Sequence, residues 1–240
     1  MLAARIIPSM LCKGPQLVKG KQFDPWRIVG ALETAVKIHA TRGVDEMLLL
    51  DVVARKQRRL FDLEMLLRLT AKVFVPLTVG GGVRGVDDVV QLLLHGADKV
   101  AIGSTAFSVI KPAAQKLGTQ AIVAMVDYDI DGMVTVGGAM VDALSYAQMC
   151  EKQGAGEVVL QSKVRDGTMA GYDIKMLQRV ASQLSIPVIV AGGCRDVSDM
   201  SIALRSGAQG VAVGALFQFC DITPREAAQV LKACGHEVRL

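Results

Sequence analysis

The chain has 240 residues, of which 51% are hydrophobic and only 4% aromatic, so its core must be built mainly from aliphatic side chains. The formal net charge of +4 comes without a lysine and arginine run or a stripe of basic and aromatic residues, which argues against nucleic acid as a partner. The sequence has neither an apolar run of transmembrane length nor the apolar segment of a signal peptide, so we expect a cytoplasmic protein that does not enter a membrane.

Cysteine and histidine residues are scattered along the chain. The 5 cysteines are odd in number and lack CxxC spacing, so we expect reduced thiols. His39, His95 and His236 lie near no cysteine or carboxylate cluster with the spacing of metal ligands. We therefore expect no metal and no other cofactor.

Apolar runs alternate with segments of helical spacing from one end of the chain to the other. Strands are predicted at residues 5–10, 46–51, 75–79, 99–102, 121–126, 157–160, 187–190 and 211–213. Helices are predicted at residues 29–42, 60–73, 86–95, 107–117, 142–153, 173–184, 197–205 and 224–234. Residues 11–28 are predicted to be a long loop, and residues 128–140 a loop or a small hairpin. This alternation predicts a parallel α/β fold.

One stretch of the sequence occurs twice. Residues 76–105 align without a gap on residues 187–216, at an offset of 111 positions, and both copies read strand, glycine turn, amphipathic helix, strand and glycine. An open doubly wound sheet is the alternative fold, but two equivalent halves close more naturally into a barrel. We therefore predict a single-domain (β/α)₈ TIM barrel over residues 1–240, with half-barrels at approximately 1–118 and 119–240.

Glycine-rich turns follow four of the predicted strands, at the end of a barrel where active sites lie. Glycine lets the backbone approach a ligand, and free N–H groups at a helix start can hold a phosphate. Two pairs of such turns, half a barrel apart, suggest a small ligand with a phosphate at each end, although such glycines often form only tight turns. The candidate binding residues at these turns, and at an Asp-Gly pair near the second one, are Gly81, Gly82, Gly103, Ser104, Asp166, Gly167, Gly192, Gly193, Gly214 and Ala215.

Charged residues stand at the start of four predicted strands. They are Arg5, Glu46, Lys99 and Glu157, and the two glutamates are equivalent under the 111-residue offset. Two charges of each sign at the strand-starting end of a barrel can form a closed ring. From the residues alone, salt bridges that seal the core are the favoured interpretation.

Several motifs resemble one known family over nearly the whole chain, namely the cyclase subunit of imidazole glycerol phosphate synthase. The motifs are MLAARIIPSMLCKGPQLVKG, VDEMLLLDVVA, PLTVGGGV, GADKVAIGS, GAGEVVLQS, RDGTMAGYD and IPVIVAGGC. The resemblance implies two half-barrel repeats, two phosphate sites and a heterodimer with a glutaminase subunit. It also implies that ammonia enters at the strand-starting end and reacts at the opposite end.

The resemblance assigns expected roles to individual residues. The charged residues Arg5, Glu46, Lys99 and Glu157 match the family's ammonia gate, so the resemblance favours a gate over a seal. Asp98 matches a contact to the glutaminase, and Lys19 of the first loop is retained. The family uses two aspartates as general acid and base. Asp127 matches one of them, whereas Leu11, which cannot transfer a proton, stands at the position of the other.

Other departures lie at the same end of the predicted barrel. Gly103-Ser104 replaces an Asn-Thr pair of the family, Val164 replaces an aspartate, and Ala215 replaces a serine. A leucine at position 11 is typical of cyclase-like proteins from acetamidino-sugar pathways of bacterial surface polysaccharides, which this chain resembles most.

We therefore expect an ammonia-receiving subunit of a glutamine amidotransferase. It would work with a glutaminase and with a separate sugar amidotransferase as a further partner. Leu11 argues against intrinsic cyclase, or lyase, activity. Two alternatives stay open. One is an authentic cyclase subunit of histidine biosynthesis, and the other is a non-catalytic scaffold that activates a glutaminase. A related phosphosugar isomerase fits the motifs less well.

Overall fold

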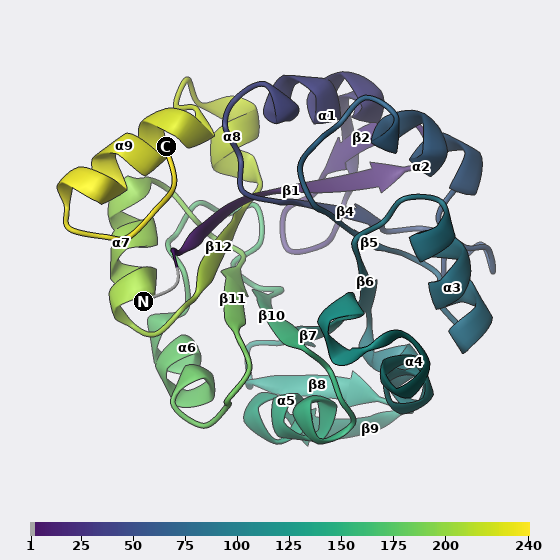
Figure 1. Ribbon diagram of the computed structural model, residues 1–240. Helices are drawn as coiled ribbons and strands as arrows, with labels where there is room; N and C mark the ends of the chain where they lie inside the picture. The colour runs from purple at the N-terminus through teal and green to yellow at the C-terminus, as the bar shows by residue number, and fades with distance from the viewer. Residues whose placement is uncertain (1–2) are drawn as a thin grey trace.

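The computed structural model describes residues 3–240, and its centre is a closed barrel of eight parallel strands. Around the barrel the strands follow the order β1-β4-β5-β6-β7-β10-β11-β12, and β12 pairs with β1 to close the ring (Figure 1). The predicted (β/α)₈ TIM barrel is therefore confirmed. The barrel strands are β1 (Arg5–Lys13), β4 (Met47–Asp51), β5 (Leu77–Gly80), β6 (Lys99–Ile102), β7 (Ile122–Tyr128), β10 (Glu157–Ser162), β11 (Val188–Ala191) and β12 (Gly210–Val213).

Helices surround the barrel and bury one face each against the outer side of the strands (Figure 1). Aspartate side chains begin several of them by accepting a backbone N–H, and α9 begins with the predicted Thr223 cap followed by Pro224. The α-helices are α1 (Leu32–Ala40), α2 (Leu63–Thr70), α3 (Val86–Leu94), α4 (Ile110–Leu117), α5 (Ala143–Lys152), α6 (Ile174–Ala181), α7 (Val197–Arg205), α8 (Ala215–Phe219) and α9 (Pro224–Ala233), with short 3₁₀ helices η1 (Ser104–Val109) and η2 (Thr119–Ala121).

The segment between β1 and α1 differs from the prediction. Instead of a loop over residues 11–28, β1 continues to Lys13 and turns into β2 (Gln16–Lys19) and β3 (Arg27–Ala31), which are antiparallel to their neighbours. The predicted helix start at residue 29 was also wrong, because α1 begins at Leu32. The physical reason is that Leu17 and Val18 are buried and continue the strand pairing of β1.

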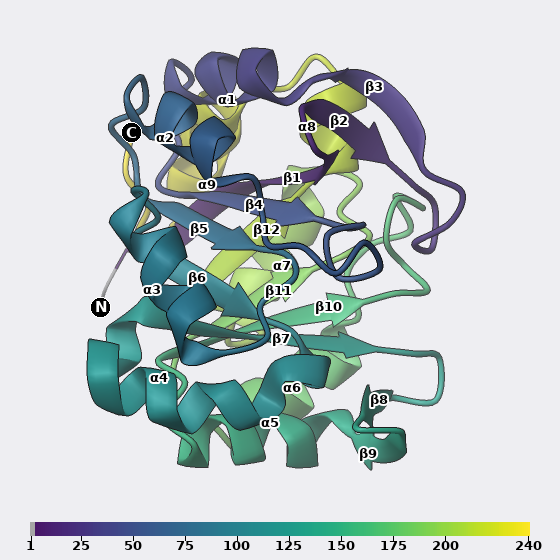
Figure 2. The same ribbon diagram turned by 90° about the vertical axis from the view of Figure 1, so that its right-hand side faces the viewer.

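A second hairpin, β8 (Met133–Val136) and β9 (Ala139–Asp142), confirms the hairpin alternative for residues 128–140. Figure 2 shows the barrel from the side, with both hairpins at the end to which the strand arrows point. The two additions therefore extend the barrel at the carboxyl ends of its strands.

The barrel interior has its own apolar layer, separate from the core between strands and helices. Because the parallel strands are covered on both faces, alternate residues of each strand point inward and both sets are apolar. The interior layer consists of Ile7, Leu48, Ala101, Val123, Met125, Val159, Ile189, Ala191 and Ala212, with Leu50 packed against it. This layer separates the charged residues at the strand starts from the polar residues at the strand ends.

The sequence repeat has a counterpart in matching hydrogen bonds. The backbone N–H of Leu77 donates to Asp98 Oδ2 at 2.8 Å, and the N–H of Val188 donates to Gln209 Oε1 at 2.7 Å. Each pair of positions is related by the same sequence offset as the repeat. The two βαβ units are thus built alike at the start of β5 and β11, while the division into halves near residue 118 stays a prediction.

The beginning and the end of the described chain lie side by side. Ala4 forms a parallel bridge with Val238, and its backbone N–H donates to the carbonyl of Glu237 at 2.7 Å. Within residues 3–240, no helix is both long and apolar enough to cross a membrane.

Candidate functional site

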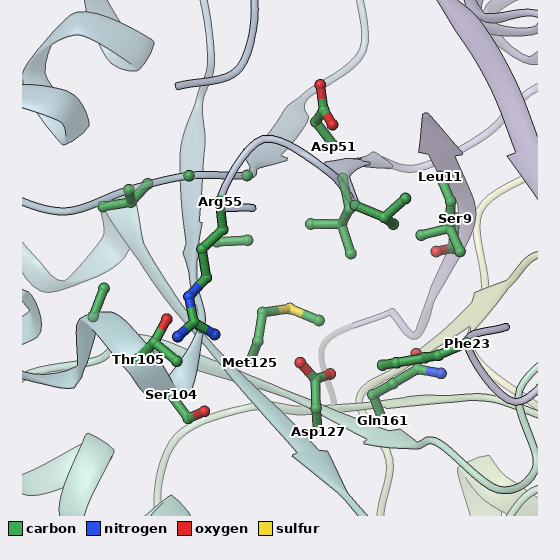
Figure 3. Close-up of a pocket in the computed structure, with 18 of the residues that line it drawn as sticks. Ser9, Leu11, Phe23, Asp51, Arg55, Ser104, Thr105, Met125, Asp127 and Gln161 are labelled. Atoms are coloured by element: carbon green, nitrogen blue, oxygen red, sulfur yellow. The ribbon is translucent and has the colours of Figure 1, made fainter. Parts of the chain in front are cut away.

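A cavity of about 360 Å³, called here the main cavity, opens at the carboxyl ends of the barrel strands. Its lining residues come from β1, the segment between β2 and β3, the ends of β4, β6, β7 and β10, and the segments that follow β4, β5, β6 and β10, so six of the eight barrel strands or the segments after them contribute to it (Figure 3). Its ionisable lining residues are Asp51, Arg55, Asp127 and Asp166. The remaining lining residues are Ser9, Leu11, Phe23, Trp26, Leu50, Val52, Gly81, Gly82, Val83, Ala101, Gly103, Ser104, Thr105, Ala106, Met125 and Gln161.

Leu11 and Asp127 face this cavity from opposite walls, because β1 and β7 are four strands apart in either direction around the ring. Leu11 is 8% exposed and lies between Leu50 of β4 and Val18 of β2. Leucine has no group that can bind or release a proton. The wall formed by β1 is therefore apolar at the position where the resemblance implies a carboxylate.

Asp127, at the end of β7, is an ionisable residue in the wall of the main cavity opposite Leu11 (Figure 3). Burial raises the pKa of its carboxyl to about 6, with Lys163 opposing the rise and Asp166 adding to it. Within residues 3–240 its side chain accepts no hydrogen bond and joins no ion pair. A carboxyl group with this pKa can exchange a proton with a ligand near neutral pH.

Asp51, at the end of β4, also lines the main cavity, but both of its carboxylate oxygens already have partners. Its Oδ1 accepts the backbone N–H groups of Val53 and Ala54 at 3.0 and 3.1 Å, and its Oδ2 pairs with Arg59 at 2.8 Å. This carboxylate therefore holds the segment after β4 in place.

The first glycine edge consists of Gly81, Gly82, Gly103 and Ser104, which follow β5 and β6. Close packing accounts for part of it, since a Cβ on Gly82, with φ of +78°, would fall 1.8 Å from the carbonyl oxygen of Arg59. A Cβ on Gly103 would meet no atom within 4 Å, so open space lies beside that residue. The structure thus supports the tight-turn interpretation for Gly82 and places Gly103 and Ser104 at the cavity.

The second glycine edge consists of Gly192, Gly193, Gly214 and Ala215, on the opposite side of the barrel after β11 and β12. A smaller cavity of about 20 Å³ lies here, also lined by Asp166 and Gly167. Gly193 is again required by packing, because a Cβ would fall 2.3 Å from the carbonyl oxygen of Gly171. Lys19 reaches into this edge from β2 and pairs with Asp166 Oδ1 at 2.9 Å.

Several lining residues of the main cavity were not predicted from the sequence, and four of them have side chains suited to ligand contact. Arg55 comes from the segment after β4, Gln161 lies near the end of β10, and Phe23 and Trp26 come from the segment between β2 and β3. The two aromatic side chains lie near each other, with ring centroids 6.1 Å apart. Two aromatic residues so close together, in a chain with 4% aromatics, were a signal that the sequence offered.

The four charged residues at the strand starts form the predicted closed ring, called here the charged ring. Arg5 contacts Glu46 at 2.8 Å and Glu157 at 2.6 Å, and Lys99 contacts the same two carboxylates at 2.8 and 3.4 Å. Thr78 also donates to Glu46 at 2.5 Å. Each cation thus lies between two anions, and each anion between two cations.

In the ring, the combined effect of opposite charges and hydrogen bonds on the pKa values of Glu46 and Arg5 is larger than the effect of burial. Burial opposes ionisation of Glu46, but Lys99, the Thr78 hydroxyl and Arg5 hold the pKa of its carboxyl below the ordinary value. Burial likewise opposes the charge of Arg5, yet Glu157 and Glu46 raise the pKa of the guanidinium. The contacts within the ring therefore favour the charged forms of Glu46 and Arg5. Asp98 lies beside the ring on the exposed surface next to Lys99, where its carboxylate caps the start of β5.

Together, these features define a (β/α)₈ barrel protein with a cavity lined by ionisable residues at the strand ends and a charged ring at the strand starts. The histidine biosynthesis protein family model matches residues 5–223. The chain therefore belongs to this family.

Curated relatives cover the chain from end to end. Three are named imidazole glycerol phosphate synthase subunit HisF. The protein of Hyphomonas neptunium is 39% identical over 250 aligned positions, covering 100% of this chain and 99% of the relative. The protein of Corynebacterium diphtheriae is 36% identical and that of Streptomyces avermitilis 34%, each with 99% of both chains covered.

Proposed function

We propose that this chain is the cyclase-type subunit of a glutamine-dependent synthase related to imidazole glycerol phosphate synthase. In this role it receives ammonia from a glutaminase partner at the charged ring and uses it at the main cavity. The observation that carries the proposal is that one barrel has a closed charged ring at one end of its axis and a cavity lined by ionisable residues at the other. The matched family and the names of the relatives support it.

The first candidate for the reaction is imidazole glycerol phosphate formation in histidine biosynthesis. Every relative described above carries the name of that synthase, so the comparisons favour this candidate. Asp127 is the group that would exchange protons with the substrate, because its raised pKa of about 6 lets it give and take a proton near neutral pH.

The second candidate is the supply of ammonia to a sugar amidotransferase in acetamidino-sugar formation. Leu11 is the specific observation that favours it, since the cavity wall opposite Asp127 carries no proton-transferring group on β1. In this case the partners would be a glutaminase and a separate sugar amidotransferase, and the barrel itself would not close an imidazole ring.

Turnover of the cyclase substrate with an ammonium salt separates the two candidates without any partner. Rates in the ordinary enzyme range, roughly 1–10³ s⁻¹, would establish the first. Turnover lower by about 10²- to 10⁴-fold, the usual contribution of one acid or base, would favour the second. Replacing Leu11→Asp should then recover activity, whereas Leu50→Asp, at the paired cavity position on β4, should not.

The route of ammonia is tested with the glutaminase present. Lys99→Met should lower glutamine-dependent activity while leaving ammonium-dependent activity unchanged, because only the former requires passage or docking at the charged ring. Lys72→Met, at an exposed ion pair with Glu33, serves as the matched control. If no glutaminase binds the chain, the proposed partnership is wrong. If a glutaminase is activated but no product forms with any acceptor, the scaffold alternative is correct.

A further inference from the structure

Two neighbouring strands bring four polar side chains together beside the main cavity. Strands β7 and β10 are parallel, and their register places Asp127 next to Gln161 (Figure 3). The backbone N–H of Lys163 donates to the carbonyl of Tyr128 at 3.1 Å, so the pairing continues past the end of β10 and brings Lys163 beside Asp129. Because alternate residues of a strand project to the same side, both aspartates share the side on which Gln161 and Lys163 lie.

Lys163 has one ion-pair partner among the described residues, and that contact is weak. Its Nζ lies 3.3 Å from Oδ2 of Asp129, and the two side chains are 28% and 51% exposed. An ion pair that is open to solvent contributes little and does not hold a long side chain in one place. The ammonium group of Lys163 is therefore free to interact with a second carboxylate.

Asp127 supplies that second carboxylate. It lies diagonally across the strand pair from Lys163, and diagonal neighbours of a sheet are on the order of 7 Å apart. This separation is too large for an ion pair but short enough for one charge to act on another. Lys163 favours the ionised form of Asp127, whereas burial and Asp166 favour the protonated form.

The other ionisable groups around Asp127 are placed differently. They are Lys19 and Asp166 at the second glycine edge, Asp51 and Arg55 at the end of β4 and after it, and Tyr146 of α5. Lys19 lies 2.9 Å from Asp166, so its charge is already paired. Arg55 enters the cavity three strands away from β7. Burial raises the pKa of the Tyr146 hydroxyl, so that group stays neutral.

We propose that Lys163 is a positioning residue of the main cavity, whose ammonium group is shared between Asp129 and Asp127 and keeps Asp127 sufficiently ionised to accept a proton from a ligand. Leu11 on the opposite wall cannot help in this task, so the balance between the two forms of Asp127 depends on its own surroundings. The inference rests on the proposed function only in taking Asp127 as the group that exchanges protons. It gives a role to a residue that does not itself line the cavity.

Titration of the Asp127 carboxyl carbon by NMR, in the ligand-free full chain, tests the proposal. We expect a midpoint of about 6 in the wild type. Lys163→Met should raise the midpoint by roughly 0.5–1 pH unit, the effect of one charge near the surface, whereas Lys163→Arg should stay close to the wild type because it keeps the charge. Arg179→Met is the matched control, since it removes another cation from an ion pair of the same region, with Asp142, and should leave the midpoint unchanged.

A double variant tests whether the ammonium group is shared. Asp129→Asn should lower the midpoint of Asp127, partly because a like charge is lost and partly because Lys163 is released towards Asp127. Only the second part requires the lysine, so Asp129→Asn should lower the midpoint less when Lys163→Met is also present. An unchanged or lowered midpoint in Lys163→Met, an equal rise in Lys163→Arg, or strictly additive effects in the double variant would each overturn the proposal.

Activity provides a second measurement. If Asp127 acts as a base, the fall of kcat/KM on the acidic side of its pH profile should move to higher pH in Lys163→Met and return in Lys163→Arg. A purely structural role would lower the rate at every pH without moving the profile, and that result would contradict the proposal. The NMR titration needs neither a glutaminase nor turnover, so the inference can stand if the proposed function fails. Conversely, cyclase turnover in a chain whose Asp127 titrates independently of Lys163 would keep the proposed function and overturn this inference.

Discussion

The two ends of the barrel handle charge in opposite ways. In the charged ring every side chain contacts two partners of opposite sign. In the main cavity, Asp127 and Arg55 have no ion-pair partner within the described residues. The charged residues of the ring are thus paired with one another, whereas Asp127 and Arg55 in the cavity can form ion pairs with a ligand.

The same strands contribute to both ends. Strand β6 begins at Lys99 of the ring and leads to Gly103 at the cavity, and β10 runs from Glu157 to the cavity residue Gln161. Because inward positions alternate along a strand, charge at the start and charge at the end are separated only by the apolar interior layer. The comparison teaches that the charges paired within the protein lie at one end of the barrel axis, whereas Asp127 and Arg55, which lack an ion-pair partner among the described residues, lie at the other.

The largest expected effect comes from breaking the ring. Glu46→Gln leaves Arg5 and Lys99 to share Glu157 alone, and loss of one partner of a buried ion pair should lower the free energy of unfolding by about 3 kcal/mol. Since the folded-state pKa of Glu46 lies below its unfolded value near 4.5, this stabilisation is present above about pH 4.5 and is lost as the pH falls through the folded-state pKa.

Urea unfolding at neutral and acidic pH measures this effect. Glu33→Gln is the matched control, because Glu33 also contacts two lysines, Lys37 and Lys72, but at the exposed surface, where solvent screens the ion pairs and the loss of stability should be much smaller than for Glu46→Gln. Equal losses of unfolding free energy for the two variants would show that the buried ion pairs of the ring stabilise the fold no more than exposed ones do.

A smaller effect, opposite in sign, is expected at the cavity. The pKa of Asp127 in the folded state, about 6, lies above its unfolded value of 3.8, so the folded state binds the proton more tightly. The carboxyl therefore costs stability above pH 6, and this cost disappears as the pH falls towards 4. Asp127→Asn should raise the free energy of unfolding at pH 7.5 by on the order of 1–3 kcal/mol.

The pH dependence distinguishes this explanation from a general packing effect. The gain from Asp127→Asn should shrink on acidification, whereas Asp129→Asn, two residues further along and exposed, should change little at either pH. A gain that does not depend on pH would contradict the raised pKa of Asp127.

The smallest effect is expected at Asp98, beside the ring. Its Oδ2 accepts the backbone N–H of Leu77, and at the equivalent place in the second repeat an amide oxygen of Gln209 accepts the N–H of Val188. Asp98→Asn keeps such an oxygen, so stability should stay within about 0.5 kcal/mol of the wild type by urea unfolding. Weaker binding of a glutaminase by this variant would then report the lost charge. A large loss of stability would mean that the carboxylate itself is needed to cap β5.

The sequence predicted the barrel because its signals are local and repeated. Buried parallel strands read as aliphatic runs such as Val188–Ala191, and the repeat marked equivalent units. The charged ring was also predictable, since strand-starting residues of a closed barrel must meet around its axis. The hairpin of β2 and β3 was missed because Leu17 and Val18 stand among glycine and proline residues, and only pairing with β1 makes them a strand.

The cavity was predicted less completely. Asp127 and the glycine edges follow strands and can be located by counting, but Arg55 lies in an irregular segment where an arginine usually faces solvent. The Lys19–Asp166 pair joins residues 147 positions apart, and no local pattern announces it. This pair lies at the second glycine edge, and the aligned repeat gives no indication of it.

The pairing of β12 with β1 makes the order of the barrel strands cyclic, and the bridge between Ala4 and Val238 holds the two ends of the described chain side by side. The chain starts and stops beside the same pair of neighbouring strands, β1 and β12, and any exposed connection could serve as the break instead. A permuted gene that joins these ends and opens the chain near Gly118 would exchange the order of the two repeats. The molecule would still close the same eight-stranded ring, with the charged ring and the main cavity in their present places.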